Sequence, residues 1–236
     1  MALCNAKAEA ARGLLEEFED EIKEASVVGV GTGSTTALAL REAQRRGLLR
    51  GKQIVVSSMA TALLASELGL KPLMPNVVDS VDIYFDGADE VVPSTLDMIK
   101  GRGAALLGEK ILAYNSRVRI YVVDESKIVD RLGSKKPLPI EVVPWALGFV
   151  LRELGKRGLE ASPREGSGKD GPVVSDWGGV IVDISTGPIE DPRRLEAELH
   201  SIPGVVETGL FLGLADAVVV GKKSCGYEVL RSGGRG

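Results

Sequence analysis

Aromatic side chains and histidine are scarce in this 236-residue sequence. Phe, Trp and Tyr make up 4% of the residues, whereas hydrophobic residues as a whole make up 44%. We therefore expect a core built mainly from Val, Leu, Ile and Ala. The single histidine, His200, falls in a segment that predicts a helix. We interpret it as a surface or helix-end residue, which disfavours a mechanism that depends on a histidine acid or base.

Long apolar runs and an excess of basic residues are also missing. No stretch reaches the roughly 18 uninterrupted apolar residues that a membrane-spanning helix needs. The first residues do not show the basic region and apolar run of a signal peptide, so we expect a cytoplasmic protein. The net charge of -4 and the pI near 5.3 argue against a nucleic-acid or anionic-membrane partner.

Cysteine is nearly absent, with only Cys4 and Cys225 present. Two cysteines so far apart in sequence have none of the spacings typical of a metal site. Two buried thiols or one disulfide bridge are both compatible with the sequence, and a reducing cytoplasm favours the thiols.

Short apolar runs alternate with helical segments over the first 133 residues. Strands are predicted at residues 26–31, 53–57, 81–86 and 119–124. Helices are predicted at residues 5–25, 34–46, 59–68 and 104–114. Such alternation implies right-handed crossovers and a mostly parallel, doubly wound sheet with helices on both faces.

The pattern changes after Gly133, where the Pro-rich segment Lys135-Lys-Pro-Leu-Pro indicates a boundary. Strands are then predicted at residues 140–143, 159–163, 173–184 and 205–211, with helices at residues 145–157 and 192–200. This βαββαβ order is typical of a smaller ferredoxin-like α+β lobe. A last apolar strand from Ala217 could return to the first sheet. We therefore predict an α/β catalytic domain of residues 1–133 plus 212–236, and an α+β domain of residues 134–211.

The first candidate site is the segment Gly29-Val-Gly-Thr-Gly-Ser-Thr-Thr, which joins a strand to a helix. Glycines allow a tight turn and a close approach of the backbone to a ligand. The N–H groups at the start of the helix, with the hydroxyls of Thr32, Ser34, Thr35 and Thr36, suit a phosphate. The segment matches neither the Rossmann fingerprint nor the Walker loop. A tight turn without a ligand is the alternative.

Acidic residues follow the third predicted strand, in Asp86-Gly-Ala-Asp-Glu. Residues at the carboxyl end of a parallel strand lie at the crevice where such folds bind ligands. The carboxylates could bind Mg²⁺ or accept hydrogen bonds from sugar hydroxyls. A solvated turn is the alternative.

Two further segments add lysines and a glutamate. Lys100-Gly-Arg-Gly leads into a helix that contains Glu109, and Asp124-Glu-Ser-Lys127 follows the fourth strand. Lys100 could neutralise an oxyanion while Glu109 serves as a base. Taken alone, the Glu-Lys pair at 109–110 is more typical of a solvated helix face. The four segments together place a phosphate site, acids, lysines and a glutamate at one sheet edge.

With these segments in this order, the chain resembles the ribose-5-phosphate isomerases of type A. The resemblance covers nearly the whole length of the chain. The resemblance extends to Ser57-Ser-Met-Ala-Thr, to Pro137-Leu-Pro-Ile-Glu-Val-Val-Pro and to Ile202-Pro-Gly-Val-Val-Glu-Thr-Gly-Leu-Phe. It implies interconversion of D-ribose 5-phosphate and D-ribulose 5-phosphate in the non-oxidative pentose phosphate pathway.

The resemblance also implies the roles of individual residues. Glu109 would carry the proton through a cis-enediolate, supported by Lys100, Asp86 and Asp89, with no metal and no cofactor. A homodimer or homotetramer is implied as well. Contacts with the pentose phosphate are implied for Thr32, Gly33, Ser34, Thr35, Asp86, Gly87, Ala88, Asp89, Lys100, Gly101, Arg102, Gly103 and Lys127.

The chain departs from the family pattern at three places. Arg102 interrupts a loop that is usually all glycine, and Gly108 stands where an arginine commonly precedes the catalytic glutamate. We hypothesise that Arg102 replaces that missing positive charge. Trp177-Gly-Gly stands where Asn-Gly-Asn is usual, and we expect it to bear little on the chemistry because it lies in the second lobe.

Three other functions compete with the isomerase. A related sugar-phosphate deaminase is disfavoured because His200 is expected far from the crevice. A CoA transferase is disfavoured because it should have a larger lobe with a CoA-binding surface, which the sequence does not show. A sugar-phosphate sensor that regulates transcription would need a DNA-binding module, and the sequence offers no basic recognition helix.

Overall fold

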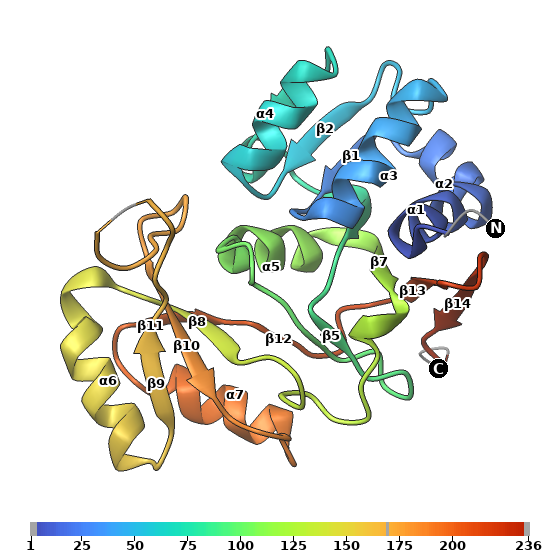
Figure 1. Ribbon diagram of the computed structural model, residues 1–236. Helices are drawn as coiled ribbons and strands as arrows, with labels where there is room; N and C mark the ends of the chain where they lie inside the picture. The colour runs from blue at the N-terminus through green and yellow to red at the C-terminus, as the bar shows by residue number, and fades with distance from the viewer. Residues whose placement is uncertain (1–3, 169, 234–236) are drawn as a thin grey trace.

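The computed structural model describes residues 4–168 and 170–233 (Figure 1). Its largest sheet has the strand order β14-β13-β7-β4-β1-β2-β3 among the described residues. Neighbouring strands are parallel except for β13 and β14, which pair antiparallel. The strands are β1 (Val27–Val30), β2 (Gln53–Val56), β3 (Pro72–Leu73), β4 (Val81–Asp86), β7 (Ser116–Asp124), β13 (Ala217–Gly221) and β14 (Tyr227–Arg231).

Apolar side chains on both faces of this sheet explain why it is buried. In β7, Ile120 and Val122 belong to a core that includes residues of α1 and α3, whereas Tyr121 and Val123 belong to a core that includes residues of α5. Alternation of this kind is expected when helices cover both faces. The helices of this part are α1 (Ala6–Glu17), α2 (Glu19–Glu24), α3 (Ser34–Arg45), α4 (Met59–Glu67) and α5 (Leu106–Tyr114), with the short 3₁₀ turns η1 (Pro75–Val77) and η2 (Glu125–Lys127).

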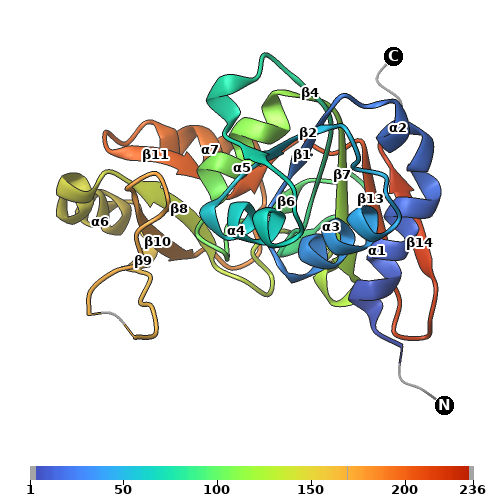
Figure 2. The same cartoon turned by 90° about the horizontal axis from the view of Figure 1, so that it is seen from above.

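A second, four-stranded sheet lies beside the first (Figures 1 and 2). All its neighbouring strands are antiparallel, in the order β11-β8-β10-β9. This order and the βαββαβ connectivity are those of the predicted ferredoxin-like lobe, and the predicted fold class is confirmed. The elements are β8 (Leu138–Val142), η3 (Pro144–Ala146), α6 (Leu147–Lys156), β9 (Glu160–Pro163), β10 (Val180–Ser185), α7 (Pro192–His200) and β11 (Val205–Thr208).

A third, small sheet connects the two larger ones, with the order β12-β6-β5. Its strands are β5 (Glu90–Val91), β6 (Met98–Ile99) and β12 (Leu210–Phe211). The strand predicted at residues 205–211 is therefore two strands that belong to different sheets. They separate at Gly209, where an added Cβ would lie 2.3 Å from the carbonyl oxygen of Lys100.

Other elements also differ from the prediction. The helix predicted at residues 5–25 is two helices, α1 and α2, which are separated at Phe18. Only residues 180–185 of the strand predicted from residue 173 form β10, because a turn that includes Gly178 and Gly179 precedes it. The short strands β3, β5 and β6 and the strand β14 were not predicted. The partner of β14, β13, returns to the large sheet as expected. No described helix has the length and apolarity needed to cross a membrane.

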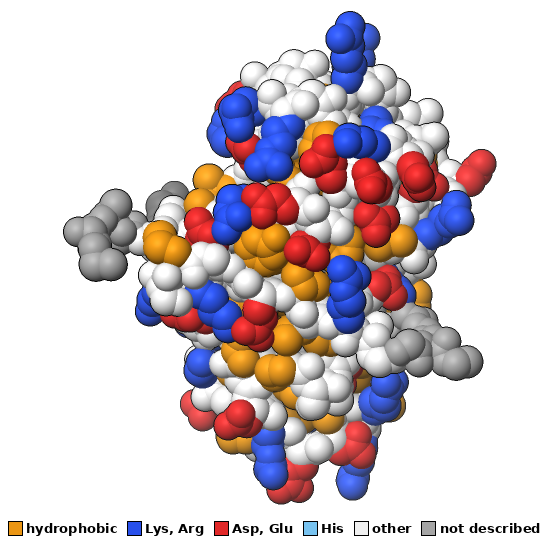
Figure 3. All heavy atoms as spheres, turned by 90° about the vertical axis from the view of Figure 1, so that its right-hand side faces the viewer, with side chains coloured by type: hydrophobic (Ala, Val, Ile, Leu, Met, Phe, Trp, Pro, Cys, Tyr) orange, Lys and Arg blue, Asp and Glu red, His pale blue; other side chains and the backbone are white. Residues whose placement is uncertain are grey.

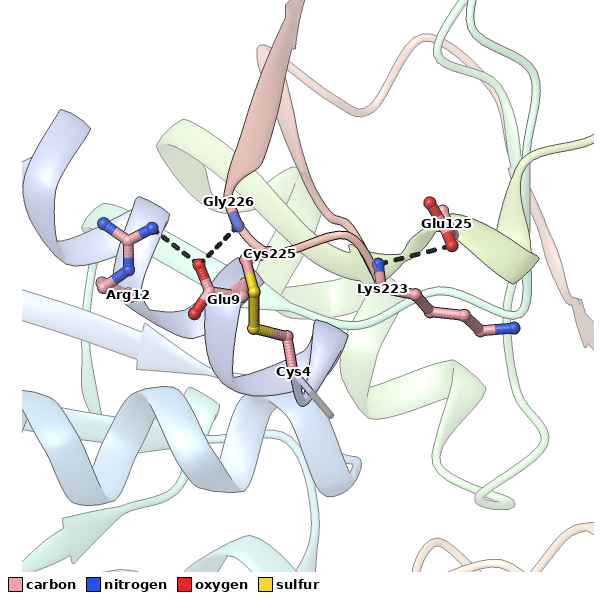
Figure 4. The surroundings of a disulfide bond; sticks show 7 residues. All are labelled: Cys4, Glu9, Arg12, Glu125, Lys223, Cys225 and Gly226. Atoms are coloured by element: carbon pink, nitrogen blue, oxygen red, sulfur yellow. Dashed lines mark hydrogen bonds and ion pairs between the residues drawn. A yellow bond between two sulfur atoms is a disulfide. The ribbon is translucent and has the colours of Figure 1, made fainter. Parts of the chain in front are cut away.

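Cys4 and Cys225 form a disulfide (Figure 4). Of the two alternatives compatible with the sequence, the structure shows the bridge. It ties the start of α1 to the turn between β13 and β14, where Glu9 also accepts a hydrogen bond from Gly226 N. Closing a loop with a sequence separation of 221 residues contributes about 5 kcal/mol in the chain-entropy treatment.

Acidic and basic side chains are interspersed on the face shown in Figure 3, the side of α2 and β14 in Figure 1. On α1, for example, Arg12 forms ion pairs with Glu9 and Glu16. A surface of mixed sign agrees with the small net charge and offers no extended basic area on this face for a polyanion.

Candidate active site

A cavity lies at the carboxyl ends of β1, β4 and β7, which are neighbours in the large sheet. The chain leaves β1 toward one edge of the sheet and β4 toward the other, so this is the switch point at which open α/β sheets bind ligands. The residues that line it are Lys7, Thr32, Gly33, Ser34, Thr35, Gly87, Ala88, Asp89, Lys100, Gly101, Arg102, Gly103, Glu109, Val122, Val123, Asp124 and Lys127.

Nearly all the predicted site residues therefore meet in one place. The exception is Asp86, which lies next to the cavity without lining it. Lys7 also lines the cavity, although no local sequence pattern predicted it. Its position depends on the packing of α1 against α3, where Lys7 Nζ lies 3.0 Å from Ser34 Oγ.

The end of the cavity at α3 is suited to a phosphate. Gly33 is the N-cap residue of α3, with a φ of 146°. Because glycine has no side chain, none accepts a hydrogen bond from the first turn of the helix. The N–H groups of that turn and the positive end of the helix dipole are available to an anion. Lys7 and Lys127 add positive charge to the same cavity, which offsets the negative net charge of the chain.

Asp86 lies buried beside the cavity and binds several of the groups that line it. The residue is fully buried, and its carboxylate accepts hydrogen bonds from Thr32 N at 2.9 Å, Gly87 N at 2.7 Å and the Tyr84 hydroxyl. Its second oxygen lies 2.7 Å from Lys100 Nζ. With these partners Asp86 fixes the turn after β1 and the lysine together. These contacts suit a positioning role, and the predicted catalytic role and contact with substrate of Asp86 stay predictions.

Lys100 and Glu109 form the chemical centre of the cavity. Lys100 Nζ lies 3.2 Å from Glu109 Oε2 and donates a hydrogen bond to Gly87 O at 2.6 Å. The Glu109 oxygen has no well-aligned donor among the described residues. Burial, with the nearby charge of Asp86, raises the pKa of Glu109 to about 8, although Lys100 opposes the rise. Burial lowers the pKa of Lys100, but the charges of Asp86 and Glu109 outweigh it and the pKa is raised.

This arrangement can move a proton to and from carbon. A carboxyl group with a pKa near neutrality is a stronger base than an ordinary glutamate, and a fixed ammonium group beside it can stabilise a developing oxyanion.

The comparisons with known proteins agree with this chemistry. Residues 53–225 match the family described as Ribose 5-phosphate isomerase A (phosphoriboisomerase A). Ribose-5-phosphate isomerase A of Aeropyrum pernix is 52% identical over 230 residues, which cover 98% of this chain and 97% of the relative.

The chain belongs to the ribose-5-phosphate isomerase A family. The enzyme of that name from Pyrococcus furiosus is 46% identical over 216 residues, covering 90% of this chain and 92% of the relative. The structure of ribose 5-phosphate isomerase A from Methanocaldococcus jannaschii aligns with a TM-score of 0.87 at 39% identity, covering 96% and 98% of the two chains. A D-ribose-5-phosphate isomerase in complex with phospho-erythronic acid aligns with a TM-score of 0.89 at 41% identity, covering 98% of this chain and 100% of the other.

Two of the departures from the ribose-5-phosphate isomerase A pattern occur together in space. A Cβ at Gly108 would lie 2.3 Å from Ser57 O and 2.8 Å from Trp177 Nε1. The indole of Trp177 therefore fills the space that a larger residue before Glu109 would need. Although Trp177 lies in the second lobe, the turn that carries it contacts the helix that contains Glu109. The expectation that it bears little on the chemistry stays a prediction.

The same turn also contacts α4. Asp176 accepts a hydrogen bond from Met59 N, the first residue of that helix, at 2.7 Å. Ser58 caps α4 and lies 2.6 Å from Thr32 Oγ1, which in turn lies 2.8 Å from Ser57 Oγ. The Ser57-Ser-Met-Ala-Thr segment therefore supports the cavity indirectly, by holding Thr32.

Arg102 lies at the rim of the cavity. Its side chain is 73% exposed, and its Nε is 3.7 Å from Asp89 Oδ1. Its backbone N–H donates to Asp89 Oδ2 at 3.0 Å. The hypothesis that Arg102 replaces the positive charge missing at Gly108 stays a prediction. A fully active Arg102→Ala variant would contradict it.

The acidic groups near the cavity do not fit a divalent metal. The ammonium group of Lys100 lies directly against Asp86, where a cation bound by these acids would have to sit. Elsewhere, ligand atoms of Glu196, His200 and Glu207 lie within 4.8 Å of one another. Lys110 Nζ lies 2.7 Å from Glu207 and 3.2 Å from Glu196, so a lysine already neutralises that group.

Proposed function

We propose that the chain interconverts D-ribose 5-phosphate and D-ribulose 5-phosphate, with Glu109 as the proton carrier and without a metal. The observation that carries the proposal is the buried Glu109, whose raised pKa and contact with Lys100 occur in a cavity with a phosphate-binding end. Membership of the ribose-5-phosphate isomerase A family supports it. So does the related structure that holds phospho-erythronic acid, an acid with a sugar-phosphate skeleton.

The reaction moves one proton between neighbouring carbons. With the phosphate at the start of α3, the opened sugar extends toward Glu109, which removes the proton from C2 and returns it to C1. The intermediate is a cis-enediolate with negative charge on oxygen. Lys100 and the N–H groups of the loop after it stabilise that charge, each donor being worth about 3 kcal/mol.

Other residues bind the parts of the substrate that do not react. Asp89 lines the cavity and is placed to accept hydrogen bonds from sugar hydroxyls and to help move their protons. Lys7 and Lys127 bind the phosphate with the first turn of α3. Binding energy from this remote end supports the chemical step, because it holds the carbon atoms against Glu109.

Turnover of ribose 5-phosphate in the presence of excess chelator tests the proposal. We expect formation of ribulose 5-phosphate at the same rate with and without chelator. Sensitivity to the chelator would contradict the metal-free mechanism. No turnover would contradict the isomerase itself and would favour a sugar-phosphate sensor.

We also propose a homodimer or homotetramer in the cytoplasm, as in the family pattern. Exposed large apolar side chains support self-association, among them Leu63 and Val77, each 61% exposed, and Tyr114, 73% exposed. The disulfide restricts a cytoplasmic location to organisms that keep such bonds inside the cell, among them hyperthermophiles. Light scattering that gives a single-chain mass of 24.9 kDa would contradict the oligomer.

A further inference from the structure

We propose that Arg164 of the small lobe is a positioning residue for the reaction. It holds two successive peptide groups of the loop after Lys100 so that their N–H groups face the cavity. The proposal rests on the function proposed above and adds a residue outside the family motifs that the sequence analysis identified.

Three elements meet at the Arg164 guanidinium. Its Nη1 donates to Gly101 O and to Arg102 O, both at 2.9 Å. On its other side, Nε donates to Asp183 Oδ2 at 2.7 Å and Nη2 donates to Asp183 Oδ1. The Arg164 side chain is only 16% exposed. A two-point ion pair of this kind fixes the plane of the guanidinium, which in turn fixes the two carbonyl groups.

The carbonyl groups determine where the N–H groups point. In a trans peptide the C=O and the N–H lie on opposite sides, and the carbonyl of one residue shares its peptide with the N–H of the next. Holding Gly101 O therefore directs Arg102 N–H away from Arg164, and this group is found on Asp89 at 3.0 Å. Holding Arg102 O likewise directs Gly103 N–H away from Arg164.

Gly103 N–H is the group left for the substrate. It has no acceptor among the described residues, and Gly103 lines the cavity. Such an N–H is suited to the oxygen that becomes negative in the enediolate.

The loop needs an external support because its own sequence makes it pliable. Gly101 has a φ of 106° and Ala104 a φ of 59°, and glycine rotates more freely than any other residue. Its remaining backbone hydrogen bonds are at its ends, from Lys100 N to Gly209 O and from Ala104 N to Gly101 O. Only Arg164 fixes the carbonyl of Arg102 among the described residues.

Two substitutions of Arg164 test this role. Arg164→Lys keeps the charge but cannot reach two carbonyls and a carboxylate at once, and Arg164→Ala removes the side chain. Arg157→Ala, at an exposed arginine of the same lobe that pairs with Glu153, is the matched control. For each protein, kcat and KM for ribose 5-phosphate are measured, with the affinities for phospho-erythronic acid and for inorganic phosphate.

We expect both Arg164 variants to lose about 30-fold in kcat, with KM changed less than threefold, because a misdirected donor is lost only in the transition state. Affinity for phospho-erythronic acid should fall while affinity for phosphate stays within twofold, and added guanidinium should restore part of the kcat of Arg164→Ala. A kcat loss of less than fivefold in Arg164→Lys overturns the proposal, as does a rise in KM alone. If Arg164→Ala does not fold, Arg164→Lys decides. An inactive wild-type protein would instead overturn the proposed function.

Discussion

Two lysines lie beside the ring of Phe211, and each holds two carboxylates. Lys100 Nζ is 5.3 Å and Lys110 Nζ is 5.1 Å from the centre of that ring. Each group pairs one lysine with two carboxylates, and the loop after Lys100 leads into α5, which carries Lys110. A pocket opens onto each of them, and they differ in how deeply their carboxylates are buried.

The Lys100 group is closed to water and open to the cavity. Asp86 and Glu109 are almost completely buried with Lys100, and Glu109 lines the cavity with its pKa raised to about 8. Three ionisable groups that share so little solvent cannot all be ideally paired, and the resulting rise in the pKa of Glu109 supports its proposed role as the base.

The Lys110 group is open to water. Its partners Glu196 and Glu207 have side chains 28% and 16% exposed, and His200 lies 3.1 Å from Glu207 with 39% exposed. Solvent stabilises these charges, and the group fastens α5 to α7 and β11. The comparison teaches that similar lysine–carboxylate groups differ mainly in the burial of their carboxylates, and we expect only the buried group to be reactive.

The largest difference in kcat between the two groups is expected when a glutamate of each is substituted. Glu109→Gln should lower kcat for ribose 5-phosphate about 1,000-fold, because general-base catalysis contributes roughly 10²- to 10⁴-fold. Glu207→Gln, the matched change in the other group, should leave kcat within threefold. Steady-state assays of both variants measure this. Equal losses in the two variants would remove the distinction between the groups.

A smaller effect is expected at the lysines. Lys100→Gln should reduce kcat about 100-fold, since it removes an oxyanion donor. It should also lower the free energy of unfolding by about 3 kcal/mol, because Asp86 and Glu109 are left buried without their cation. Lys110→Gln should keep kcat within fivefold. Assays and urea unfolding of the two proteins provide the comparison, and a greater loss of kcat in Lys110→Gln would reverse our assignment.

The pH dependence should reflect the buried group alone. The base must be deprotonated, so kcat/KM should rise about tenfold per pH unit and level off above about 8, the pKa of Glu109. Between the ordinary value of 4.5 and about 8, folded Glu109 keeps a proton that the unfolded chain has lost. Its contribution to stability therefore decreases as the pH rises through this range. Glu109→Gln should remove that decrease in pH-dependent unfolding, and a profile already flat at pH 6 would contradict the assignment.

The smallest effect is expected at the only histidine. His200→Gln should change kcat less than twofold and leave the pH profile unmoved, because His200 lies in the solvent-exposed group at the end of α7. A shift of the profile in this variant would show that the two groups are coupled.

Much of the site could be predicted because local patterns determine it. The apolar run of β1 followed by Gly31 and Gly33 predicts a turn, and an added Cβ at Gly31 would overlap Asp86. Acids and lysines that follow parallel strands must meet at one edge of the sheet. The prediction that these residues share one cavity therefore needed only their order along the chain.

The rest depends on contacts between distant segments. The Glu109–Lys110 pair has the pattern of a solvated helix face, yet α5 packs against β8 and β11 and both residues are buried. Lys7, Arg164 and Trp177 reach the cavity or its supports only through the packing of other elements. The disulfide requires the two ends of the chain to meet, which no local pattern encodes.

The protonation of Glu109 itself is the central claim, and carbon-13 NMR measures it directly. The Glu109 carboxyl resonance can be assigned in protein labelled at the glutamate side-chain carboxyl, by its absence in Glu109→Gln. We predict a titration midpoint near 8 in the ligand-free protein. A midpoint near the ordinary value of 4.5 would contradict the account, because burial would then not be what makes this glutamate the base.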